Sequence, residues 1–129
     1  IQLSITIIFF FFLCSCNNNS ELELGEKTIM KVNEVYDAGE VMKGKIIEAK
    51  FLVKNEGKNP LIIGEVRGSC SCTVASKPTE PIKPGETKEI IAKVNTDKMS
   101  AGEKSKSVRI VANTEPSVTI VTIKAKIKI

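Results

Sequence analysis

The residues with the greatest chemical potential are two cysteines separated by one serine, Cys70-Ser71-Cys72. In an extended strand, residues two apart lie on the same face, about 6.6–6.8 Å from each other. This spacing is at the edge of what a disulfide spans, so a bond between the two cysteines requires a local turn. Such a bond would stabilise little, because the chain-entropy relation gives about 1.6 kcal/mol for a three-residue loop, against about 3 kcal/mol for fifteen residues.

Four interpretations of this pair are open. Cys70 and Cys72 could form a reducible disulfide that faces an oxidising compartment, or bind a soft metal such as Cu(I) as two thiolates. They could also form mixed disulfides with a partner, or pack as two small apolar side chains. Zinc is disfavoured, because the chain has no His and no second cysteine pair in the fold to complete a tetrahedral site. We therefore assign no metal site and expect no cofactor.

A third cysteine, Cys16, closes the stretch Leu13-Cys14-Ser15-Cys16, which follows an apolar run that begins at Ile5. That run is too short to span a bilayer as a helix, which needs about 20 residues, and it fits the apolar core of a signal peptide. The stretch resembles the lipobox of bacterial lipoproteins, with Cys16 as the thiol that carries lipid. Neither a methionine nor a basic segment precedes the run, so we expect the start of the chain to be missing.

The lipobox divides the chain into three parts. We expect residues 1–15 to be a lipoprotein signal peptide, residues 16–27 a flexible polar tether, and residues 28–129 one folded domain. Two or more acyl chains hold a protein stably at a membrane. The expected location is therefore the bacterial cell envelope, with a lipid anchor at the outer membrane or facing the periplasm.

The composition excludes several functions. The net charge is only +4, acidic residues are interspersed with the lysines, and 5% of the residues are aromatic, so we expect no binding of nucleic acid. The absence of His removes the commonest general base. The carboxylates are scattered, and no Gly-rich loop follows a strand to cradle a phosphate. We therefore expect that the protein is not an enzyme and has no catalytic residues.

Apolar and polar residues alternate with a period of two around residues 47–54, 90–94, 108–112 and 121–129, which is typical of half-buried strands. Turn signals separate these runs, among them Pro84-Gly85, which suits the centre of a type II turn. Strands at this spacing predict an all-β antiparallel sandwich of two sheets and about seven strands. The residues expected to face its interior are Phe51, Val53, Leu61, Ile90, Val94, Ile110 and Ile123.

Four segments in order resemble the bacterial domain of unknown function 1573 family: residues 51–57, 60–63, 69–73 and 81–86. The resemblance runs from about Tyr36 to the end of the chain. That family is similar to the immunoglobulin-like domains of the ASPM, SPD-2 and hydin group. The resemblance thus implies an immunoglobulin-like sandwich in an envelope protein, without enzymatic activity.

Ser71 stands where that family usually has Gly between the two cysteines. If the turn there needs a left-handed residue, Ser71 costs about 1 kcal/mol. Relative to family members with Gly at this position, this cost tilts the present chain slightly toward an unbonded cysteine pair, and the four interpretations stay open.

These observations predict a non-catalytic binding or structural module held at the membrane by lipid on Cys16. Its expected partner is another envelope protein or a surface polymer, since loops and sheet faces are what such a fold offers. The alternative is a thiol-redox or copper-handling accessory protein that uses Cys70 and Cys72.

Overall fold

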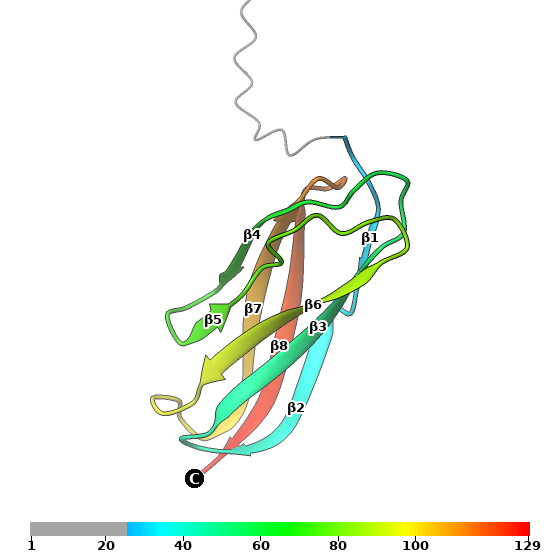
Figure 1. Cartoon of the computed structure of the whole chain (residues 1–129). Helices are drawn as coiled ribbons and strands as arrows, with labels where there is room; N and C mark the ends of the chain where they lie inside the picture. The colour runs from blue at the N-terminus through cyan, green and yellow to red at the C-terminus, as the bar shows by residue number, and fades with distance from the viewer. Residues whose placement is uncertain (1–25) are drawn as a thin grey trace, which may run out of the picture.

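The computed structural model describes residues 26–129 (Figure 1). The predicted signal peptide and most of the predicted tether, including Cys16, lie outside the described residues. All regular secondary structure in the described range is β-strand. No helix in this range is long and apolar enough to cross a membrane.

Eight strands form two sheets of four. Their bounds are β1 (Met30–Val32), β2 (Val35–Met42), β3 (Ile46–Asn55), β4 (Ile63–Gly68), β5 (Thr73–Ala75), β6 (Thr87–Asn95), β7 (Gly102–Ala112) and β8 (Val118–Lys128). The strand orders are β1-β3-β6-β5 and β2-β8-β7-β4. The predicted all-β sandwich is therefore confirmed, although β2 pairs with β8 in parallel while the other neighbours are antiparallel.

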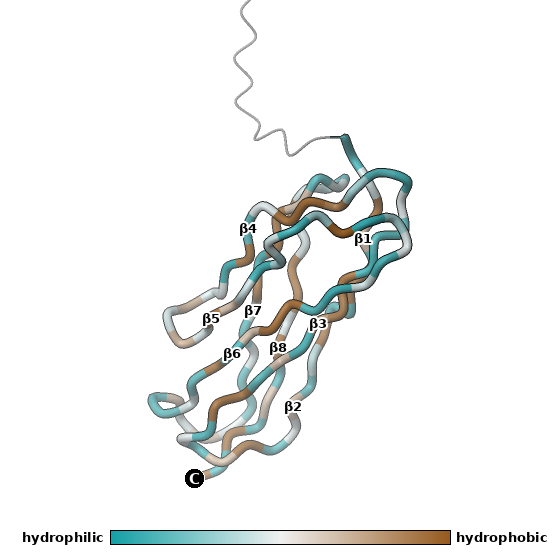
Figure 2. The backbone as a smooth tube through the Cα atoms, viewed as in Figure 1, coloured by the Kyte–Doolittle hydropathy of each residue, from teal (hydrophilic) through white to brown (hydrophobic). Residues whose placement is uncertain are grey.

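The core lies between the two sheets and follows from the alternation along each strand (Figure 2). In β3, every second residue from Ile47 to Asn55 is buried and the residues between them are exposed. The seven residues predicted to face the interior are at most 2% exposed, which confirms the chosen face of each strand. Across the sandwich, the Tyr36 ring of β2 meets the Phe51 ring of β3 edge to face, with centroids 6.3 Å apart.

Asn55, the last residue of β3, is completely buried and ties together the loops at the end of the sandwich where residue 26 enters. Its Oδ1 accepts hydrogen bonds from the Thr28 hydroxyl at 2.8 Å and the Gly57 N–H at 3.0 Å. Its Nδ2 donates to the carbonyls of Asn59 at 2.7 Å and Ile82 at 2.9 Å. One side chain thus satisfies polar groups from three separate segments.

The next loop along the same side depends on a second carboxamide, Asn113, which is 5% exposed. Its Oδ1 accepts from the Ile62 N–H at 2.7 Å, and its Nδ2 donates to the carbonyls of Glu26 and Pro60 at 2.7 and 2.8 Å. In the described residues every buried side-chain nitrogen and oxygen has a partner. The buried polar groups are therefore committed to holding the fold.

The predicted type II turn at Pro84-Gly85 is confirmed and belongs to this network. Gly85 has a φ of 80°, which a residue without a Cβ adopts easily. The Glu86 N–H donates to the Lys83 carbonyl at 2.9 Å, and the Gly85 N–H donates to the Asn55 carbonyl at 2.8 Å.

We predict that Asn55→Ala lowers the free energy of unfolding by about 2–4 kcal/mol, because it leaves buried donors and acceptors without partners. Asn95→Ala is the matched control. Asn95 also ends a strand, but it is exposed and its side chain accepts one hydrogen bond, from the Asp97 N–H. This control should cost less than about 1 kcal/mol. Urea denaturation measures both, and equal costs would contradict the role given to Asn55.

Candidate functional site

The two cysteines lie where the chain crosses from one sheet to the other, in the turn between β4 and β5. A disulfide joins Cys70 to Cys72, with the Cα atoms 5.3 Å apart. The chain turns here, as the Thr73 N–H donates to the Cys70 carbonyl at 3.1 Å. This turn shortens the Cα separation from that of an extended strand and brings the sulfurs together.

Of the four interpretations of this pair, the structure contains the disulfide, and the slight tilt toward an unbonded pair is wrong. It rested on a left-handed conformation at Ser71, but no residue other than glycine has a positive φ in the described part of the chain. Ser71 forms the turn in an ordinary conformation and carries none of the expected cost. The redox and metal-binding roles of Cys70 and Cys72 remain predictions.

Hydrogen bonds hold the two sides of this turn to different sheets. On the β4 side, the Ser69 N–H donates to the Ser107 carbonyl of β7 at 2.9 Å, and the Ser107 N–H donates to the Ser69 hydroxyl at 3.3 Å. On the β5 side, the Asn95 N–H of β6 donates to the Cys72 carbonyl at 2.8 Å. The disulfide thus closes a crossover that both sheets position.

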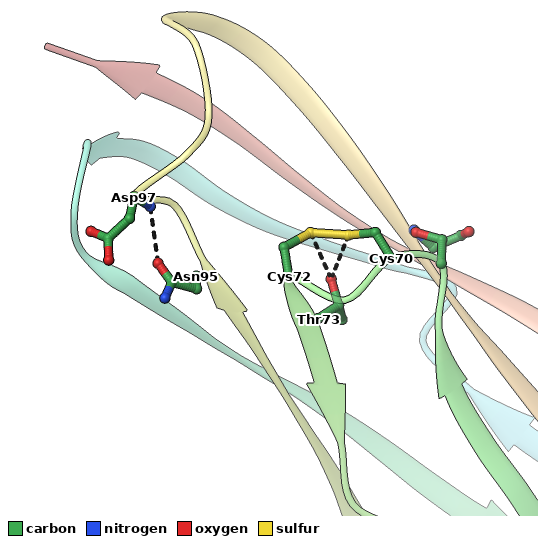
Figure 3. The surroundings of a disulfide bond; sticks show 7 residues. Cys70, Cys72, Thr73, Asn95 and Asp97 are labelled. Carbon is green, nitrogen blue, oxygen red and sulfur yellow. Dashed lines mark hydrogen bonds between the residues drawn. A yellow bond between two sulfur atoms is a disulfide. The ribbon is translucent and has the colours of Figure 1, made fainter.

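Thr73 supports the disulfide from beneath (Figure 3). Its side chain is nearly buried, and its Oγ1 lies 3.8 Å from the sulfur of Cys70 and 3.8 Å from that of Cys72. Gly68 makes this arrangement possible, because a Cβ there would lie 2.6 Å from the Thr73 carbonyl oxygen. Both cysteines are half-buried and Ser71 between them is exposed.

The chemistry available around this turn is limited. Across residues 26–129, no three or more His, Cys, Asp or Glu side chains are placed to hold a metal ion together. The nearby Asp97 N–H is already bonded to the Asn95 side chain at 2.9 Å (Figure 3). Binding of Cu(I) by the two sulfurs would first require that the disulfide be reduced.

Sequence reasoning missed the two buried asparagines, Asn55 and Asn113. Asn is common in turns for local reasons, so neither residue was among those expected to face the interior. The available signal was an Asn on the buried face at the end of an alternating strand, since Asn55 continues the row of Phe51 and Val53.

We predict that Cys70 and Cys72 contain no free thiol in the protein purified without reductant. Trypsin should release both in one fragment, residues 68–88, because prolines follow Lys77 and Lys83. After denaturation and alkylation, this fragment should carry no label by mass spectrometry. Reduction before alkylation should add two labels. Alkylation of the unreduced sample at both positions would contradict the bonded pair.

Solved structures share the fold. A protein of unknown function from Porphyromonas gingivalis W83 is 22% identical, with a TM-score of 0.69 over 84% of this chain and 51% of that one. An ASH / PapD-like domain of human CEP192 is 10% identical, with a TM-score of 0.57 over 79% of this chain and 87% of that one. The secreted serine protease VesC from Vibrio cholerae is 11% identical, with a TM-score of 0.60 over 76% of this chain and 23% of that one.

Each similarity covers only part of the matched protein. This chain spans about half the length of the Porphyromonas protein and under a quarter of the protease. No curated protein matches the sequence. The family comparison covers most of the domain, from residue 29 to residue 127. The chain belongs to the family described as protein of unknown function DUF1573.

Proposed function

We propose that this protein is a non-catalytic binding module, held at a bacterial membrane by lipid on Cys16, that contacts another envelope protein or a surface polymer. The fold supports the coarse part of this proposal, because PapD-like and immunoglobulin-like domains expose sheet faces and loops around a closed core. The likeness to the Vibrio cholerae protease covers less than a quarter of the protease chain. It is a likeness of fold alone and carries no catalytic activity over to this protein.

One observation carries the proposal. The described residues use their buried polar side chains for internal hydrogen bonds, yet they leave large apolar side chains at least half exposed. Exposed apolar side chains on the outer sheet faces are available to a partner, whereas catalysis needs placed polar groups. The exposed apolar residues are Ile29, Val35, Met42, Ile46, Leu52, Val74, Ile120 and Ile129.

Lipid attachment has a direct test. Cells that express the protein should incorporate a fatty-acid analogue into it, and Cys16→Ala should abolish this label, because the thiol is the expected acceptor. Cys14→Ala is the matched control, since it changes the neighbouring cysteine of the same stretch, and it should keep the label. Labelling that survives in Cys16→Ala would rule out this anchor.

Partner binding can be tested in intact cells with a photo-crosslinking amino acid at Leu52, Val74 or Ile120. We expect a discrete adduct from at least one of these sites, because each lies on an outer sheet face and is at least half exposed. The control position is Lys126, which shares the outer face of β8 with Ile120. Absence of any adduct at the three apolar positions, or equal adducts at Lys126, would contradict a specific binding surface.

A second candidate function is thiol–disulfide exchange, which the Cys70–Cys72 bond favours because it lies in a turn whose cysteines are only half-buried. A thiolate of a partner dithiol would attack one sulfur, the S–S bond would break, and the partner's second thiol would release the mixed disulfide. The partner is then oxidised, and Cys70 and Cys72 end as two thiols. To test this candidate, the folded protein is treated with dithiothreitol, then alkylated, and only then denatured and digested with trypsin. Mass spectrometry of the fragment 68–88 counts the labels. Two labels on fragment 68–88 would support exchange, and an unlabelled fragment would exclude it.

A further inference from the structure

In the sheet with the order β1-β3-β6-β5, part of β3 has no neighbouring strand on the β1 side. β1 pairs with β3 only through Met30–Val32, which lie opposite Asn55–Val53. The chain then crosses to the other sheet, where β2 pairs with β8 (Figure 1). In the described part of the chain, residues 46–52 of β3 therefore have no strand beside them on the β1 side, although β6 pairs with them on the other.

The alternation of hydrogen bonds along β3 shows which of its backbone groups face this open edge. The Glu56 N–H donates to the Ile29 carbonyl at 2.9 Å, so even-numbered residues of β3 direct their backbone toward β1. The Leu52 N–H continues this row and donates to the Asn33 side chain at 2.9 Å, where β1 has ended. Next in the row are Lys50 and Glu48, whose N–H and C=O groups point to the open edge.

An apolar floor lies beneath this edge on the side of the other sheet. Tyr36, Ala38 and Val41 of β2 pack against the core, yet they stay partly exposed. Their neighbours on β8, Ile123 and Ile127, are 2% exposed. β8 lies between β2 and β7 in its sheet, whereas β2 is an edge strand with a neighbour on one side only. The Phe51 ring of β3 meets the Tyr36 ring, but it leaves Tyr36 partly exposed.

We propose that an extended segment of a partner polypeptide adds to this edge, antiparallel to β3, between Asn33 and the β2–β3 turn. Residues 47–51 set its length at about five residues. Main-chain hydrogen bonds to Lys50 and Glu48 hold it, as in other cases of strand addition. Its inward side chains are apolar and rest on Tyr36, Ala38 and Val41.

The outward side chains of the segment set its charge. The residue opposite Lys50 is acidic and the residue opposite Glu48 is basic, because opposite charges directly across a strand pair attract and like charges repel. Lys50 and Glu48 are both exposed on the outer face of β3. A second copy of this chain fits less well, because each copy carries β2 at the edge of its other sheet, and pairing of the two β3 edges would bring these two β2 strands together.

The test uses the full chain in detergent micelles and a synthetic peptide, valine–glutamate–valine–lysine–valine, blocked at both ends. Run antiparallel to β3, this peptide places glutamate opposite Lys50 and lysine opposite Glu48. The control peptide exchanges its two charged residues and keeps the composition. An NMR titration measures both affinities, and amide exchange measures protection of the Glu48 and Lys50 N–H groups.

We expect the first peptide to bind about fivefold more tightly than the control and to slow exchange at Glu48 and Lys50. The double variant E48K/K50E should reverse the preference, while the charge-swapped pair E103K/K126E on the other sheet should leave it unchanged. Equal binding of the two peptides, or no binding of either, would overturn the proposal. A concentration-dependent dimer that E48K/K50E abolishes would assign the edge to a second copy and would also overturn it.

Discussion

The buried carboxamide of Asn55 is the interaction on which this sandwich depends most. Two apolar sheet faces pack readily, but the loops that join them carry backbone donors and acceptors that water cannot reach. Asn55 bonds three such groups and the Thr28 hydroxyl, and it is itself completely buried. Asn113 does the same for the adjoining segments. The end of the domain next to the preceding chain is thus held by side chains as well as by packing.

The chain crosses between the sheets at both edges of the sandwich, and the two crossings differ. Between β4 and β5 the crossing is tight, because Gly68 lets the backbone approach Thr73 and a disulfide closes the turn. Between β1 and β2 the crossing leaves part of β3 without a neighbour. At the first crossing a disulfide fixes the turn, and at the second main-chain groups of β3 lie open above the partly exposed apolar side chains of β2.

The surface chemistry fits a binding role better than a catalytic one. Glu65 is paired with Arg67 at 2.9 Å and lies 3.6 Å from Arg109, so the two arginines share one carboxylate on an exposed sheet face. Such exposed pairs contribute little to stability. Together with the exposed lysines and apolar residues of the strands, they form surfaces of mixed character, which is what recognition of another macromolecule uses.

The alternation of apolar residues determined the fold class and the core, since a strand has only two faces and one of them must be buried. Phe51, Val53 and Ile110 could be placed inside from the sequence alone, and Pro84-Gly85 could be placed in its turn. Tertiary structure decided the rest. The Cys70–Cys72 bond depends on a turn conformation at Ser71 that both sheets impose, and the burial of Asn55 depends on loops distant in sequence. The open edge of β3 exists because the chain leaves this sheet after Val32 and continues as β2, which pairs with β8. That pairing joins residues far apart in the sequence.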